Sequence, residues 1–119
     1  MASILIIEDD EDIRSGMAEI LREEGYEVAT AADGRAALSW LRTGNDASLI
    51  LLDLMMPGMN GWQFRSEQLR DPLIASIPVV VISGSETDQE TASLNAVGVL
   101  IKPLNLEQLF GAAERYCRA

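Results

Sequence analysis

The 119 residues are 48% hydrophobic, which predicts a single domain able to bury one core. A formal net charge of -10 disfavours direct binding to nucleic acid or to an anionic membrane, because both require a basic face. The chain has no histidine and one cysteine, Cys117, so zinc sites, histidine-based catalytic triads and an internal disulfide are poorly supported.

An apolar run at residues 4–7 predicts the first β-strand, and the acidic block at residues 8–12 follows it directly. A helix is expected from Glu11 to Glu24, because acids in its first turn suit the helix dipole and Gly25 can end it. Its inward stripe is predicted to consist of Ile13, Met17, Ile20 and Leu21.

The first apolar run follows Met1 almost directly and is too short for a signal peptide or a membrane segment. The lone cysteine fits a reducing compartment. We therefore expect a cytoplasmic protein.

The middle of the chain alternates in the same way. Residues 26–30 read as a short strand, and Asp33 is a predicted N-cap for a second helix that residues 44–46 end. Residues 49–52 form a buried strand that leads into Asp53. The second helix is expected to bury Ala37, Leu38 and Leu41, and a third helix is expected from Asn60 to about Arg70.

The last third of the chain repeats the alternation. A fourth strand is predicted at residues 77–82, a short fourth helix from about Asp88 to Ala96, and a fifth strand at residues 99–101. The last helix is expected to start at the N-cap Asn105 and to bury Leu106, Leu109, Phe110 and Ala113. About five strands alternating with five helices predict an α/β fold, a doubly wound parallel sheet with helices on both faces.

Charged and polar residues follow four of these strands. Glu8 and Asp9 end the first strand, Asp53 the third, Ser83 the fourth and Lys102 the fifth. Parallel strands point their carboxyl ends to one edge of a sheet, so these side chains are expected to meet there. Crowded carboxylates repel one another unless a cation neutralises them, and Mg²⁺ or Mn²⁺ is the natural occupant of such an oxygen-rich site.

An aspartate with a metal and an amine can attack a phosphoryl group. The metal and the amine neutralise the equatorial phosphoryl oxygens, and the product is an acyl phosphate. Such a mixed anhydride is energetic and short-lived, which suits a signal.

Four ordered motifs resemble the receiver domain of bacterial two-component response regulators. They are IIEDD at residues 6–10 with Arg14 beyond, LLDLMMPGMNG at 51–61, VISG at 81–84 and IKPL at 101–104. The resemblance covers essentially the whole chain and implies one flavodoxin-like (βα)5 receiver domain over residues 1–119.

The resemblance also implies roles for the acidic residues. Asp53 is the expected phosphoryl acceptor, and a sensor histidine kinase or a histidine phosphotransfer protein is the expected donor. Asp9 and Asp53 would bind Mg²⁺ directly, Glu8 through a water molecule, and Met55 through its backbone carbonyl.

Two further residues have implied roles at the phosphoryl group. Lys102 would pair with Asp53 and then with the phosphate, while the Ser83 hydroxyl would bond a phosphoryl oxygen and draw its loop inward. A cis peptide before Pro103, as in the family, would aim Lys102 inward. The resemblance implies a switch with self-catalysed phosphotransfer and dephosphorylation rather than a turnover enzyme.

The chain departs from the family pattern at its usual output surface. Val99 stands where an aromatic residue commonly changes rotamer on phosphorylation, and valine is too small and too stiff for that movement. The interval from Ser83 to Lys102 is also shorter than is common. Either the loop after Ser83 relays the signal alone, or another helix reads it out; the downstream partner and self-association stay open.

The same residues fit three other functions less well. A Mg²⁺-dependent phosphatase with an aspartyl nucleophile would normally carry a second acid two positions after Asp53, where Met55 stands. A flavin-binding module would need a Ser/Thr/Gly-rich phosphate loop in place of residues 8–12. A receiver-like scaffold that is never phosphorylated is disfavoured because the acids, the hydroxyl and the lysine are all present.

Overall fold

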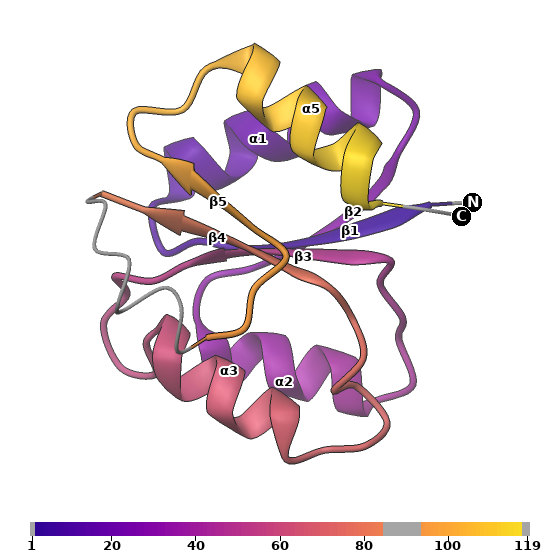
Figure 1. Ribbon diagram of the computed structural model, residues 1–119, viewed down its shortest axis with the longest axis vertical. Helices are drawn as coiled ribbons and strands as arrows, with labels where there is room; N and C mark the ends of the chain where they lie inside the picture. The colour runs from indigo at the N-terminus through magenta and orange to yellow at the C-terminus, as the bar shows by residue number, and fades with distance from the viewer. Residues whose placement is uncertain (1, 85–93, 118–119) are drawn as a thin grey trace.

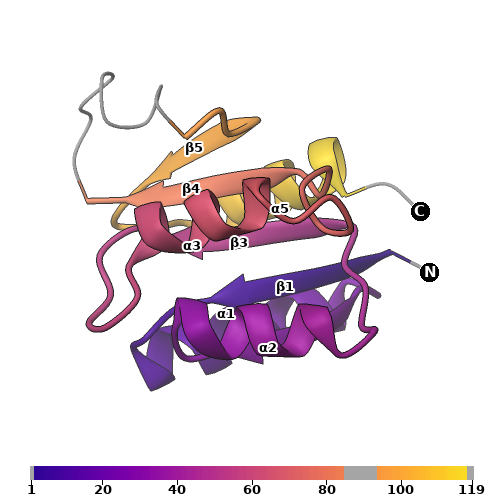
Figure 2. The same cartoon turned by 90° about the horizontal axis from the view of Figure 1, so that it is seen from below.

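The computed structural model describes residues 2–84 and 94–117. Five parallel strands form one sheet in the order β2-β1-β3-β4-β5, as a doubly wound flavodoxin-like fold requires. Figures 1 and 2 show the strand arrows pointing to one edge. The strands are β1 (Ser3–Ile7), β2 (Glu27–Ala31), β3 (Leu49–Asp53), β4 (Val79–Ser83) and β5 (Gly98–Ile101).

Helices cover both faces of the sheet, as predicted. Of the helices in the described residues, two lie on one face and two on the other (Figure 1). The first pair is α1 (Glu11–Glu23) and α5 (Leu106–Tyr116), and the second pair is α2 (Gly34–Arg42) and α3 (Gly61–Leu69). Most of the helix predicted from Asp88 to Ala96 lies outside the described residues, and its last part, at Leu94 and Asn95, is a turn.

Side chains of each strand alternate between two cores. Leu5 and Ile7 of β1 pack toward α2 and α3, whereas Ile4 and Ile6 pack toward α1 and α5. Because both faces are covered, β3 and β4 are buried along their whole length, which explains their uninterrupted apolar sequences.

Side-chain caps fix where the helices begin. The predicted N-caps Asp33 and Asn105 accept hydrogen bonds from the backbone N–H groups of Ala36 and Gln108. Asn60 caps α3 in the same way. Caps of this kind each stabilise a helix by about 1 kcal/mol.

Two apolar residues predicted to face the core lie at the surface instead. Ile13 is 43% exposed and Leu106 is 53% exposed, whereas Met17, Leu21 and Leu109 from the same predicted stripes are buried. Ile13 and Leu106 belong to the first turns of α1 and α5, next to the carboxyl ends of the strands, where they line an open groove instead of packing on the sheet. Helical periodicity predicts which face of the helix a residue lies on, but not whether another element packs against that part of the face.

Among residues 2–84 and 94–117, no helix is long and apolar enough to cross a membrane.

Candidate functional site

The predicted site residues come together at the carboxyl edge of the sheet. Asp53 is the last residue of β3 and lies beside Ile82 of β4, while Glu8 directly follows β1. Ser83 ends β4, and its backbone carbonyl accepts a hydrogen bond of 2.8 Å from the N–H of Lys102. Strand register thus places four segments distant in sequence around one point.

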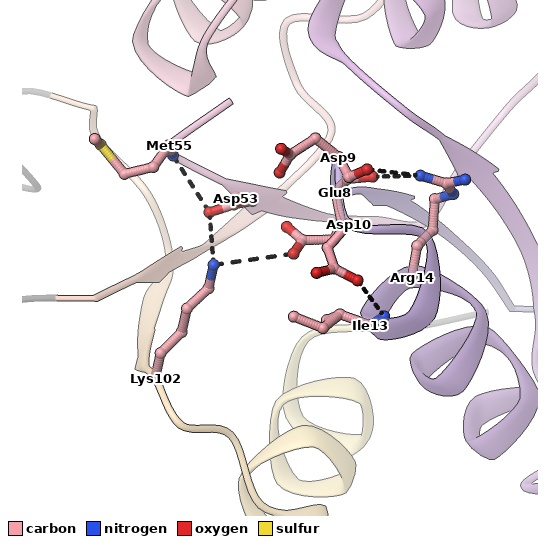
Figure 3. A network of polar contacts seen from close by, with 8 residues as sticks. All are labelled: Glu8, Asp9, Asp10, Ile13, Arg14, Asp53, Met55 and Lys102. Atoms are coloured by element: carbon pink, nitrogen blue, oxygen red, sulfur yellow. Dashed lines mark hydrogen bonds and ion pairs between the residues drawn. The ribbon is translucent and has the colours of Figure 1, made fainter. Parts of the chain in front are cut away.

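Lys102 is the cation of this site (Figure 3). Its Nζ lies 3.2 Å from Asp53 Oδ1 and 3.9 Å from Glu8 Oε1. The same Asp53 oxygen accepts a hydrogen bond of 3.3 Å from the backbone N–H of Met55. The peptide bond between Lys102 and Pro103 is cis, as the resemblance implied.

The two inner carboxylates are almost entirely withdrawn from solvent. Glu8 is 2% exposed and Asp53 is 1% exposed, and Glu8 Oε2 and Asp53 Oδ2 are buried with no hydrogen-bond partner. The pKa of Glu8 is raised to about 8: burial is the largest cause, hydrogen bonding to Asp53 and repulsion from it contribute as well, and Lys102 opposes the rise. Two ionised carboxylates cannot satisfy each other, so this pair requires either a proton or a cation between its members.

A divalent cation fits the oxygens that the chain supplies. Glu8, Asp9 and Asp53 each offer an oxygen, and these oxygens lie within 4.8 Å of one another. Two of these residues, Glu8 and Asp53, also carry the unpartnered buried oxygens. An all-oxygen donor set suits Mg²⁺ or Mn²⁺, so the residues fit the predicted ion.

The structure also places Met55, Ser83 and Val99, whose roles stay predictions. Met55 is 69% exposed, so its side chain adds nothing to the buried donor set, and a role in metal binding would fall to its backbone. Ser83 is buried at the end of β4. Val99 is 41% exposed on β5, an edge strand of the sheet.

Gly61 allows α3 to begin against the strand that carries Asp53. A Cβ atom at this position would lie 2.7 Å from the Cα of Leu54 and 2.9 Å from the backbone oxygen of Asp53. Such contacts are too short for any side chain. No local sequence pattern could predict this requirement for glycine, because the approach of helix to strand end is a tertiary contact.

An apolar groove opens beside the acidic site. It runs between α1 and α5, has a volume of about 830 Å³, and has Glu8 and Lys102 in its wall. Its apolar lining includes the partly exposed Ile13 and Leu106, together with Met17, Ile20, Leu104 and Leu109.

Two buried polar residues of α3 escaped the sequence analysis. Arg65 donates to the backbone oxygens of Leu94 and Asn95 at 2.8 and 3.0 Å, and to Gln68 Oε1 at 2.8 Å. Gln68 in turn donates to the carbonyls of Ile74 and Ile77. An arginine on a helix normally indicates a solvated face, so no local signal could predict this network, which ties α3 to the chain entering β4 and β5.

Comparison with known proteins agrees with this geometry. A family model described as the response regulator receiver domain matches residues 4–114. The sensory transduction protein RegX3 of Mycobacterium bovis is 39% identical over 113 residues, which cover 92% of this chain and 48% of that protein. The regulatory protein SphR of Synechococcus elongatus is 32% identical, over 98% of this chain and 47% of that protein. The chain thus spans about half the length of the curated relatives it matches.

Solved structures resemble the whole chain. The chemotaxis protein CheY4 of Vibrio cholerae superposes with a TM-score of 0.90 at 32% identity, and 98% of each chain is covered. The response regulator TrrA of Thermotoga maritima, solved in complex with Mg²⁺ and BeF, gives a TM-score of 0.85 at 28% identity over 98% of this chain and 99% of that one.

Proposed function

The chain belongs to the response regulator receiver domain family, and from this premise we propose that it accepts a phosphoryl group on Asp53. The observation that carries the proposal is the Asp53 carboxylate, held 3.2 Å from the Lys102 ammonium inside a group of carboxylates with unpartnered oxygens. We further propose that this receiver domain takes up residues 1–119 and works in the cytoplasm, which the single cysteine fits.

The proposed transfer uses residues already in place. A carboxylate oxygen of Asp53 attacks phosphorus, the bond from phosphorus to the donor histidine nitrogen breaks, and the electron pair stays on that nitrogen. The Lys102 ammonium then pairs with a phosphoryl oxygen, and the Ser83 hydroxyl donates to another. Mg²⁺, held by Glu8, Asp9, Asp53 and the Met55 carbonyl, would supply positive charge to the phosphoryl oxygens when bound.

Access to Asp53 requires a side-chain movement. The Asp53 side chain is 1% exposed, and Lys102 Nζ is bonded to its Oδ1. The Lys102 side chain is itself partly exposed, so a rotation of this side chain can uncover the carboxylate without moving the backbone. We propose that binding of the cation and of the donor displaces Lys102 in this way.

A switch fits the site better than a turnover enzyme does. Met55 lies where an aspartyl phosphatase would need an acid, and its exposed thioether cannot protonate a leaving group. Phosphotransfer and dephosphorylation catalysed by the domain itself are part of the proposal. Binding partners would then distinguish the two forms of the domain.

Acetyl phosphate provides a direct test of the acceptor. With Mg²⁺, the wild type should gain one phosphoryl group by intact mass, labile to base and suppressed by a chelator. Asp53→Asn should gain none. Asp33→Asn is the matched control, because it removes the same charge from an N-cap position where asparagine serves equally well. Undiminished modification of Asp53→Asn would refute the assignment.

The apolar groove is the proposed docking surface for the phosphohistidine donor. It adjoins Lys102 and Glu8, so a donor seated there would bring its phosphoryl group to Asp53. Leu106→Glu should slow transfer from a phosphohistidine protein by about tenfold, as loss of a central interface contact does, and leave acetyl phosphate transfer unchanged. Leu73→Glu is the control, because Leu73 is exposed but precedes β4 at the other edge of the sheet. Equal effects of both variants would contradict this docking site.

For the way in which phosphorylation is transmitted to a partner, we propose the same two hypotheses that the sequence suggested. Val99 lacks an aromatic ring to reorient, so either the loop after Ser83 or another helix transmits the change. Amide chemical shifts with and without a phosphoryl mimic distinguish these routes. If only residues touching Asp53 respond, the relay through the loop after Ser83 is wrong.

A further inference from the structure

Arg14 contacts the loop that carries two of the proposed metal ligands. Its Nη1 donates to the backbone carbonyl of Glu8 at 2.9 Å and lies 3.4 Å from that of Asp9. Figure 3 shows the guanidinium on the side of this loop away from Lys102. Arg14 is half-buried in α1, and the start of that helix is fixed by the Asp10 side chain, which accepts from the N–H of Ile13.

The contact leaves the carboxylates untouched. Among the ion pairs of the described residues, Arg14 takes part in none, and the acids of the site pair with Lys102 instead. A guanidinium bound to a carboxylate would occupy the oxygens that a cation needs. Bound to the carbonyls, it fixes the two peptide groups while the oxygens of Glu8 and Asp9 remain available.

We propose that Arg14 is a positioning residue for the divalent cation, and this inference rests on the proposed function. It holds the backbone of Glu8 and Asp9 so that their carboxylates are aimed at Asp53 before the ion arrives. Groups that orient metal ligands in this way are commonly worth about tenfold or more in metal affinity.

The sign of the effect separates positioning from simple charge. Arg14 is a cation near an acidic site, so it repels Mg²⁺ through space, and its removal should tighten metal binding if charge were its only contribution. A positioning role requires the opposite result. Weaker Mg²⁺ binding after loss of a positive charge therefore has to come from the backbone contacts.

The experiment measures Mg²⁺ affinity directly, by following amide chemical shifts of residues at the site during a Mg²⁺ titration. Arg14→Met should raise the Mg²⁺ dissociation constant by about tenfold. Arg14→Lys should recover part of the affinity, because an ammonium can reach one carbonyl. The initial rate of phosphorylation by acetyl phosphate at saturating Mg²⁺ should stay within about twofold of wild type, as expected for a residue that acts on ion binding alone.

Arg22→Met is a matched control on the same helix. Arg22 also donates to a backbone carbonyl, that of Val28 at 2.9 Å, but at the far end of α1. This variant should bind Mg²⁺ as the wild type does. If Arg14→Met binds Mg²⁺ equally well or more tightly, or if Arg22→Met loses as much affinity, the inference is wrong while the proposed function stands. A wild type that binds no Mg²⁺ overturns both.

Discussion

Stability without metal should fall as pH rises, because Glu8 is buried beside Asp53. The pKa of Glu8 is raised from 4.5 to about 8 in the folded protein. Above pH 4.5 the unfolded chain therefore loses a proton that the native state keeps, so each further pH unit favours unfolding until the folded pKa is passed. At 1.36 kcal/mol per pKa unit, the full effect is about 5 kcal/mol, of which about 3 kcal/mol falls between pH 5.5 and pH 8.

The chain offers an unusually clean background for this measurement. It has no histidine, so few groups other than the terminal amine ordinarily titrate in this window. Urea unfolding at pH 5.5 and pH 8 with a chelator should show the loss in the wild type. Glu8→Gln should remove it, and the exposed Glu19→Gln should leave it unchanged.

Mg²⁺ should remove much of this dependence of stability on pH. The ion competes with the proton for the Glu8 and Asp53 oxygens, so added Mg²⁺ should stabilise the protein more at pH 8 than at pH 5.5. A Glu8→Gln variant that retains the wild-type slope, or a wild type that gains stability toward pH 8 without metal, would refute the reasoning.

Two other substitutions probe the site and its support. Lys102→Met should slow phosphorylation by acetyl phosphate about a hundredfold, as loss of a transition-state donor does, with Mg²⁺ affinity equal or higher; an unchanged rate in intact-mass time courses would exclude the proposed role of the ammonium. Arg65→Met should lower the free energy of unfolding by about 3 kcal/mol, because it leaves the buried carbonyl of Leu94, the partly buried carbonyl of Asn95 and the Gln68 side chain without their donor. Arg42→Met, which loses only exposed ion pairs, should cost less than about 1 kcal/mol in the same urea titrations, and equal losses would contradict this account.

Local signals in the sequence determined most of the secondary structure. The uninterrupted apolar runs before Asp53 and Ser83 predicted strands buried on both faces, and Asp33 and Asn105 predicted the two helix starts. Strand runs follow from the pattern of apolar residues, and N-caps from side chains that accept hydrogen bonds from nearby backbone N–H groups. Both can therefore be predicted from the sequence before the fold is known.

The sequence offered no reliable guide to burial where burial depends on contacts with other segments of the chain. Ile13 and Leu106 have the period of core residues, yet they line an open groove and stay partly exposed. Arg65 has the appearance of a surface residue, yet its partners, Leu94 and Asn95, arrive from about thirty positions along the chain. Pattern alone cannot distinguish these cases, because burial is a property of neighbours.

By itself, the sequence determined which groups end the strands, and parallel strand order then required them to share an edge. Only the tertiary structure decided how closely they meet: Lys102 reaches Asp53 across 49 positions, and two carboxylate oxygens are left buried without partners. Strand register and the approach of α1 set those distances. The distance between the carboxylates decides whether they share a cation, a proton or neither. This distance is set by tertiary packing, so no local sequence pattern predicts it.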